Sequence, residues 1–140
     1  MASLDHVQAA VAGEFIQAGH GKRSPMNRLD RGDVIICYAS KVSFGKPAPH
    51  QRFAALGTVM DDEAYVGEKM GGLPAFRRAV RYAELPHEAE VRPLLERLSF
   101  VPKPRHWGLP FRRGFFEINT EDAGVIISAL GTEPPPSADG

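Results

Sequence analysis

One apolar run constrains the fold of this chain more than any other stretch. It spans residues 34 to 39, Val-Ile-Ile-Cys-Tyr-Ala, and contains no charged residue. The run is short and rich in β-branched residues, so it predicts a strand. Because apolar and polar residues do not alternate along it, we expect this strand to be buried on both faces.

Hydrophobic spacing elsewhere predicts further elements around this run. Phe53, Ala55, Gly57 and Val59 fall on one side of a strand over residues 52 to 60. The other predicted strands cover residues 76 to 82 and 115 to 118, and the predicted helices cover residues 4 to 12, 90 to 98 and 120 to 130.

The order of these elements predicts the fold class. It shows no strand–helix–strand alternation and no internal repeat. We predict an α+β fold, a small mixed β-barrel of about five to six strands with roughly two to three flanking helices. One domain is expected over residues 1 to 131, and the proline-rich residues 132 to 140 are predicted to form a disordered tail.

Composition narrows the class of protein. Apolar residues make up 43% of the chain and charged residues 24%, as in ordinary globular proteins. No apolar run could span a bilayer and no signal peptide opens the sequence, so no membrane partner is expected. The lone Cys37 cannot form an internal disulfide, which favours a cytoplasmic location. Paired cysteines and histidines at metal-ligand spacing are both lacking, so we expect no metal and no cofactor.

Charge is unevenly distributed along the chain, although the formal net charge is zero. Residues 15 to 60 hold seven Lys or Arg, but only Asp30 and Asp33 as acids. Residues 101 to 116 hold four basic residues and no acid. Such segregation predicts a basic face on the folded domain, which would attract a polyanion such as nucleic acid.

The segment over residues 105 to 114 combines large rings with arginines. It contains Trp107, the only tryptophan, and Phe111 four residues later. Gly108 permits a backbone turn and Pro110 prevents a regular ladder, so the rings should lie on a stiff, irregular segment. Aromatic faces beside guanidinium groups suit a nucleobase with its phosphate. The alternative is that both rings fill the core, as most large aromatic side chains do.

Short motifs along the chain occur in the order and at the spacing of a known family. They are Phe15-Ile16-Gln17, His20-Gly21-Lys22, Tyr38-Ala39-Ser40-Lys41, Phe76-Arg77-Arg78, Trp107-Gly108 and Phe111-Arg112-Arg113-Gly114. With these motifs, the chain from Ser3 to Leu130 resembles the EVE-domain family, also called uncharacterised protein family 0310. The resemblance implies a PUA-like fold, related to YTH and ASCH domains, with a pocket for a modified nucleobase.

The sequence departs from the family pattern at two places. Relatives usually begin with a strand carrying Tyr-Trp just before the segment that matches Ser3, and this chain starts without it. We therefore expect an unpaired sheet edge beside residues 34 to 38, which would favour a homodimer or reduced stability. In addition, Ala39 stands between Tyr38 and Ser40 where many relatives have Tyr-Ser-Pro, which alters the rim of the implied pocket.

The predicted site residues fall into two groups. Those expected to line a nucleobase pocket offer rings or hydrogen-bonding groups: Gln17, His20, Tyr38, Ser40, Trp107 and Phe111. Those expected to contact phosphates are basic: Lys22, Arg23, Lys41, Arg77, Arg112 and Arg113. Each basic residue taken singly is also compatible with an ordinary solvated charge, so only their convergence would indicate a site.

From these residues we expect a non-catalytic module that binds RNA or DNA and recognises a modified base. An enzyme acting on nucleotides or modified bases is the first alternative. Against it, Cys37 lies in an apolar strand, where a thiol is inert, and no paired carboxylates accompany the basic loops. A protein–protein interaction module that uses the exposed arginines is the second alternative. An enzyme would consume a nucleotide substrate, whereas a reader would only retain it.

Overall fold

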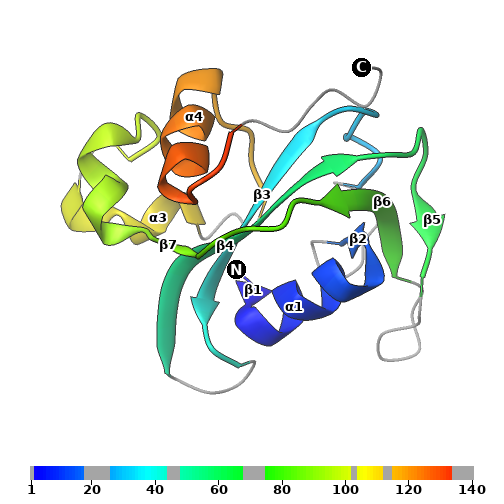
Figure 1. The fold of residues 1–140 in the computed structure, drawn as a ribbon, viewed down its shortest axis with the longest axis horizontal. Coiled ribbons are helices and arrows are strands. Elements are labelled where there is room, and N and C mark those ends of the chain that lie inside the picture. The colour runs from blue at the N-terminus through cyan, green and yellow to red at the C-terminus, as the bar shows by residue number, and fades with distance from the viewer. Residues whose placement is uncertain are drawn as a thin grey trace.

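The apolar run becomes β3 (Val34–Lys41), which pairs antiparallel with the long strand β4 (Pro49–Val59). The computed structural model describes residues 2–17, 26–43, 48–67, 75–101, 104–111 and 115–133. The other strands in these ranges are β1 (Ala2–Ser3), β2 (Phe15–Ile16), β5 (Tyr65–Val66), β6 (Phe76–Tyr82) and β7 (Ala89–Glu90). Together they form a seven-stranded sheet in the order β1-β3-β4-β6-β2, with β5 beside β6 and β7 beside β4 (Figure 1).

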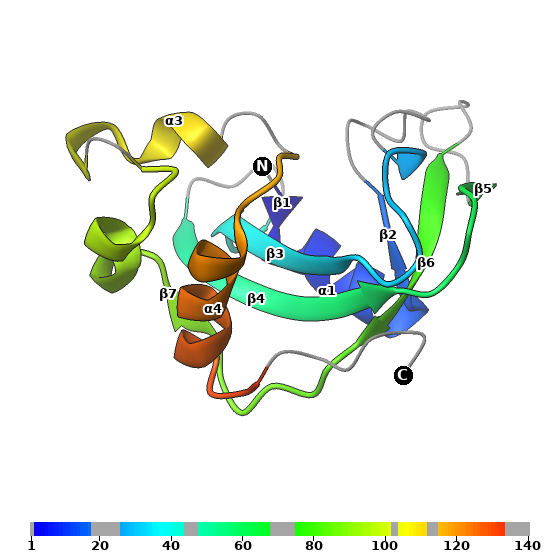
Figure 2. The same ribbon diagram turned by 90° about the horizontal axis from the view of Figure 1, so that it is seen from above.

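The sheet is curved but open (Figure 2). Its described pairings are antiparallel except that of β1 with β3, and none of them joins β2 back to β1. The expected α+β class with a mixed sheet is confirmed. The expected PUA-like barrel is not confirmed, since none of the described pairings closes the sheet.

Helices cover both faces of the sheet. On one face, α1 (Leu4–Gly13) packs against β3 and β4, and α4 (Thr120–Ala129) lies on the other face (Figure 1). Three short helical segments accompany α4, namely η2 (Arg92–Arg97), η3 (Pro104–His106) and α3 (Gly108–Phe111). Within the described ranges, no helix combines the length and the apolar character that crossing a membrane would require.

The two faces of β3 belong to different cores. Ile35, Cys37 and Ala39 pack in the cluster that includes Val7 of α1. The side chains of Ile36 and Tyr38 point to the other face of the strand and pack against the cluster that includes α4 and η2. β3 therefore packs against a core on each face, but only the α1 side is fully buried, since Ile36 and Tyr38 are partly buried and Val34 is 45% exposed.

A bulge in β4 changes which of its side chains share a face. Cys37 pairs with Ala55 but Tyr38 pairs with Phe53, so Ala54 is left over between the two registers. As a result, Phe53 lies in the α4 core while Ala55 lies in the α1 core. The predicted alternation, with both of these side chains on one side of the strand, is wrong because the extra residue reverses the faces.

Two predicted elements differ in the structure. The helix predicted over residues 90 to 98 is replaced by the shorter 3₁₀ helix η2, because Glu90 is held in β7 by its pairing with β4. The strand predicted over residues 115 to 118 is irregular. Its Phe116 and Ile118 side chains pack against the α4 core instead.

The predictions for the two ends of the chain have different outcomes. The helices predicted over residues 4 to 12 and 120 to 130 are confirmed as α1 and α4. Gly131 follows α4 with φ of 78°, a left-handed conformation that commonly ends helices. The predicted tail over residues 132 to 140 lies outside the described residues after its second residue, so the domain boundary stays a prediction.

The sheet edge at β3 is only partly covered. β1 pairs with β3 opposite Ala39 and Lys41. Among the described strands, only β4 pairs with residues 34 to 38, so this stretch has a partner strand on one side, as expected. A homodimer formed through this edge stays a prediction.

Candidate functional site

The rings singled out in the sequence meet in one aromatic cluster between the sheet and α3. Tyr38 stacks on Phe111, with ring centroids 4.3 Å apart and an interplanar angle of 28°. Trp107 meets Phe111 edge-on at 6.1 Å, and Phe53 of β4 lies 6.1 Å from the same ring. Two further rings complete the cluster: Phe100 and Phe116.

Burial separates the roles of these rings. Phe111 is 6% exposed and is surrounded by its aromatic neighbours, so its faces belong to the core. Tyr38 and Trp107 are only partly buried. Of the predicted rings, these two are therefore the ones a ligand can reach, and Phe111 supports them from beneath.

Arg92 was missed by the sequence interpretation, although it lies beside both accessible rings. Its guanidinium carbon is 5.4 Å from the centroid of the Trp107 ring. Its Nε donates a hydrogen bond to Oε1 of Gln51 at 3.2 Å, and the backbone N–H of Val91 donates to the Gln51 carbonyl at 3.1 Å. Because the β4–β7 pairing creates this neighbourhood, no local sequence pattern could have revealed it.

The Tyr38 hydroxyl is protonated at neutral pH. Burial raises the pKa of Tyr38 to about 12, and the positive charge of Arg92 opposes this shift. The hydroxyl can therefore donate a hydrogen bond to a ligand placed against the cluster.

The two predicted polar residues at the end of β3 lie on the same strand as Tyr38. Ser40 is partly buried, and Lys41 is exposed where β1 pairs with β3. Both therefore lie at the end of the strand that carries Tyr38.

The remaining described candidates lie at the opposite end of the molecule. Gln17 follows β2 and Arg77 belongs to β6, and Arg77 Nε donates to Gln17 Oε1 at 2.8 Å. Both ribbon views place β2 and α3 on opposite sides of the molecule (Figures 1 and 2). The structure therefore divides the predicted residues between two locations and joins Gln17 to Arg77 rather than to Trp107.

Five predicted site residues lie outside the described ranges, and the structure does not place them: His20, Lys22, Arg23, Arg112 and Arg113.

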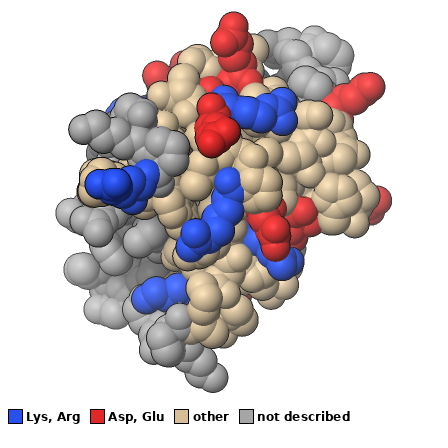
Figure 3. All heavy atoms as spheres, turned by 90° about the vertical axis from the view of Figure 1, so that its left-hand side faces the viewer, with Lys and Arg blue, Asp and Glu red and all other residues tan. Residues whose placement is uncertain are grey.

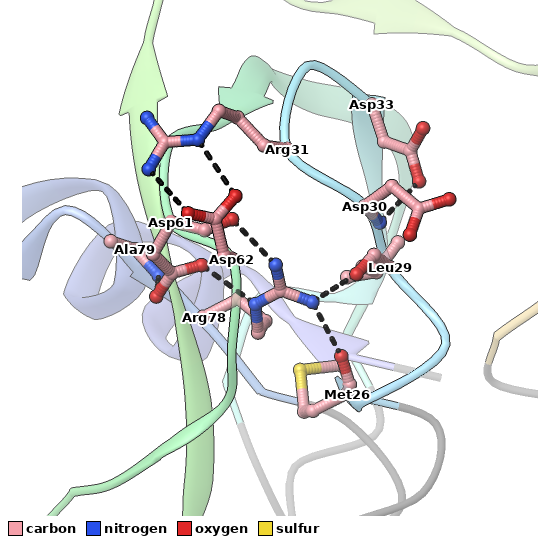
Figure 4. Close-up of polar contacts among 9 residues, drawn as sticks. All are labelled: Met26, Leu29, Asp30, Arg31, Asp33, Asp61, Asp62, Arg78 and Ala79. Carbon is pink, nitrogen blue, oxygen red and sulfur yellow. Dashed lines mark hydrogen bonds and ion pairs between the residues drawn. The ribbon is translucent and has the colours of Figure 1, made fainter.

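Arg78 follows Arg77 in β6, but its side chain points to the opposite face of the sheet and forms a buried polar network. Its side chain is 0% exposed, and its Nε and Nη2 donate to Oδ1 and to the carbonyl of Asp61 at 2.6 Å and 2.7 Å. Its Nη1 donates to the carbonyls of Met26 and Leu29 (Figure 4). This network holds two loops against β6.

A polar cavity of about 290 Å³ lies beside this network, lined by Asn27, Asp62, Glu63, Ala64 and Arg78. The guanidinium of Arg31 forms a two-point contact with Asp62, with a shortest distance of 2.9 Å (Figure 4). Two of the cavity's charged lining residues already have partners, since Asp62 is paired with Arg31 and Arg78 with Asp61, and these pairs hold the loops together.

Charge on the face that carries η2 and α3 is mixed. Basic and acidic side chains are interspersed over the described part of this face (Figure 3). Arg52, for example, lies 3.4 Å from Glu90 and 3.8 Å from Glu88. The predicted basic face is therefore not seen there.

Two kinds of reactive group, a thiol and a metal cluster, bear on whether the described residues could act in catalysis. Burial raises the pKa of the Cys37 thiol to about 11, with a smaller opposing effect from its hydrogen bond to Tyr82, so the thiol is neutral and unreactive at neutral pH. In the described ranges, no three His, Cys, Asp or Glu side chains gather where they could hold a metal ion.

Comparison with known proteins identifies relatives over nearly the whole chain. A family model described as EVE domain matches residues 1–129. A UPF0310 protein of Mycolicibacterium gilvum (strain PYR-GCK) is 40% identical over 131 residues, which cover 94% of this chain and 92% of that protein. A UPF0310 protein of Streptococcus sanguinis (strain SK36) is 31% identical over 133 residues, covering 95% and 92% of the two chains.

Proposed function

This chain belongs to the EVE-domain family, and from that premise we propose that it is a non-catalytic, PUA-like module that binds nucleic acid and recognises a modified nucleobase. The observation that carries the proposal is the pair of accessible rings, Tyr38 and Trp107, mounted on a buried aromatic base. Arg92 lies beside them and supplies a positive charge.

Each group has a distinct role in this proposal. The Trp107 face would stack on the base, an interaction worth roughly 1–3 kcal/mol per base. The protonated Tyr38 hydroxyl would donate a hydrogen bond to an acceptor on the base edge. Arg92 would pair with a phosphate, since a guanidinium donates two parallel hydrogen bonds to one phosphate group.

Support for stacking comes from rigidity as well as from exposure. Phe111 is fixed by contacts with Tyr38, Phe53 and Trp107, so the accessible rings rest on a packed layer. A surface that is already ordered loses little side-chain entropy when a base binds. The preference for a modified base rests on the family relationship and not on this geometry.

Binding without turnover is part of the same proposal. The buried thiol of Cys37 supplies no nucleophile, and the groups beside the accessible rings in this proposal are a phenol and a guanidinium. Incubating the protein with each bound oligonucleotide and recovering the nucleosides unchanged would agree with a reader. Any altered base or released fragment would instead establish an enzyme.

The test of the stacking surface is Trp107→Ala. We expect its affinity for a single-stranded oligonucleotide carrying the preferred base to fall by roughly 1–3 kcal/mol. Titrations with methylated, hydroxymethylated and unmodified bases would measure it, with circular dichroism as a check on folding. Leu109→Ala is the matched control, because Leu109 lies only two residues from Trp107, at the start of α3, but is 53% exposed and is absent from the aromatic cluster.

Two results would contradict the proposal at different levels. Unchanged binding by Trp107→Ala would reject the stacking surface. Equal affinity for modified and plain bases would reject recognition of a modification and leave a general nucleic-acid binder.

A further inference from the structure

The outer face of β6, at the end of the molecule away from α3, carries an arginine in an unusual setting. Arg77 lies between strands on both sides, with β2 along one edge of β6 and Tyr65 of β5 directly opposite it on the other. None of the residues in β6 belongs to the core under α4. The described helices on that side therefore leave this part of the sheet uncovered.

Three neighbours fix the position of the Arg77 guanidinium. Its carbon lies 3.7 Å from the centroid of the Phe15 ring, a close cation–π contact. Its Nε donates to Gln17 Oε1 at 2.8 Å. Gly67 packs so closely that a Cβ there would lie 2.8 Å from the guanidinium carbon and 2.4 Å from Cδ of the same side chain.

The strand register explains why these groups converge. Phe15 pairs with Ala79, so its side chain shares a face with Arg77 two residues earlier on β6. Gln17 lies two residues after Phe15 and therefore on that same face. The close approach of the chain at Gly67 is possible because glycine has no side chain.

These contacts use one nitrogen of the guanidinium, Nε, as a hydrogen-bond donor. The two Nη nitrogens, which form the fork of the guanidinium, are not used by them. Within the described ranges, neither Nη atom of Arg77 forms a hydrogen bond, and no carboxylate is paired with this side chain. Buried or tightly packed cations are normally neutralised by a nearby acid. Here the packing partners are a ring, an amide and a glycine, so the charge is positioned but not neutralised by them.

We propose that Arg77 is a preorganised binding site for a phosphate group of the nucleic-acid backbone, remote from the base pocket. The guanidinium fork matches two oxygens of one phosphodiester, and little side-chain freedom remains to be lost on binding. The ring of Tyr65, 41% exposed and directly across from Arg77, offers a stacking surface for a neighbouring base.

This inference rests on the proposed function for the identity of the ligand and adds a second contact point to it. A strand whose base stacks on the accessible rings of Tyr38 and Trp107 would be held again at Arg77. The domain would then bind an extended segment of nucleic acid and not a single nucleotide, so affinity should rise with oligonucleotide length.

Arg81 provides the matched control for a test. It lies on the same strand four residues from Arg77 and is exposed, and its side chain forms no hydrogen bond or ion pair in the described part of the chain. Arg77→Ala and Arg81→Ala each remove one positive charge. A contribution that depends only on net charge would therefore affect the two variants alike.

The experiment measures binding of a fluorescein-labelled single-stranded DNA, the RNA of the same sequence, and an abasic deoxyribose-phosphate oligomer of equal length. We expect Arg77→Ala to weaken all three at least about ten-fold and to lower the salt slope by about 0.7, against a loss of about two-fold for Arg81→Ala. Arg77→Lys should also weaken binding but leave the salt slope nearly unchanged, since it keeps the charge but loses the two parallel hydrogen bonds of the guanidinium. Gln17→Glu should also weaken binding, because a carboxylate would neutralise the guanidinium.

Each other outcome overturns part of the argument. Equal losses for Arg77→Ala and Arg81→Ala would reject the preorganised site while leaving the base pocket intact. If Trp107→Ala has no effect but Arg77→Ala does, the base pocket fails and the phosphate site stands. If the parent binds none of the probes, both fail, and Arg77-dependent binding of a polyglutamate peptide would then identify a protein-binding surface instead.

Discussion

Arg77 and Arg78 are consecutive residues of β6, yet they belong to different regions of the molecule. Arg78 points inward, is 0% exposed, and is paired with Asp61 and with backbone carbonyls (Figure 4). Arg77 points to the outer face, where its described partners are a ring and an amide. The inner arginine is neutralised by its surroundings, and the outer one is only positioned by them.

The difference shows that residue type does not decide what a charged side chain does. Both residues are arginines in one motif, Phe76-Arg77-Arg78, and successive side chains of a strand point to opposite faces. An arginine whose donors are consumed inside the fold contributes to stability. An arginine whose Nη donors stay available can contribute to binding a ligand.

The largest expected effect is on the inner face. Arg78→Ala should lower the free energy of unfolding by roughly 3–5 kcal/mol, because it leaves the Asp61 carboxylate and two loop carbonyls without their donor. Urea denaturation followed by circular dichroism measures it. A loss below about 1 kcal/mol would show that solvent replaces the arginine easily.

A second test uses the buried thiol of Cys37, on the face of β3 that packs against α1. The unfolded Cys37 thiol ionises near 9, whereas the folded thiol keeps its proton until about 11. The unfolded state therefore binds fewer protons in this window, so stability is complete below pH 9 and falls as the pH rises, by about 1 kcal/mol per pH unit. Urea unfolding measured at roughly pH 8, 9 and 10 gives the slope of stability against pH, and Cys37→Ala should flatten that slope. An unchanged slope in that variant would assign the effect to the neighbouring tyrosines.

The third test concerns the spacing between β4 and β6. Gly57 pairs with Tyr82, and a Cβ at this glycine would lie 2.5 Å from Cγ1 of Val80 and 3.0 Å from the carbonyl of Arg81. Gly57→Ala should therefore destabilise the protein by roughly 1–3 kcal/mol through overpacking. Gly124→Ala is the control, because a Cβ there meets no atom within 4 Å and alanine favours the interior of α4. A stabilised Gly57→Ala variant would show that the strands separate at little cost.

The smallest expected effect returns to the outer face. Arg77→Ala should change the free energy of unfolding by no more than about 1 kcal/mol, since a partly exposed cation–π contact contributes about that much. The same denaturation experiment compares it directly with Arg78→Ala. Similar losses in the two variants would mean that Arg77 serves the fold, and the distinction between the two faces would disappear.

Several parts of the fold followed from local patterns. The apolar run became β3 with a core packed against each face, and the regularly spaced apolar residues of α1 and α4 formed helices. These predictions succeeded because strand and helix periodicity depend on neighbours within a few residues. The residues of the aromatic cluster were also recognisable, since large rings on a segment that cannot continue a strand must pack against something else.

Other parts depended on contacts between distant segments. The bulge at Ala54 reversed the faces of β4, and pairing with β4 drew Glu90 out of the predicted helix. The same pairing brought Arg92 beside Trp107, and the β2–β6 register joined Gln17 to Arg77. Each result requires two strands to choose one register among several, and that choice is made by packing across the whole sheet.

The sequence by itself determined the strand at β3, the helices at α1 and α4, and which rings and charges are available. The tertiary structure decided which of those groups meet. It placed Phe111 in the core and left Trp107 accessible, and it buried Arg78 while positioning Arg77 on the surface. The physical reason is that hydrophobic periodicity is a local property of the chain, whereas the burial and pairing of a side chain depend on what the rest of the fold packs against it.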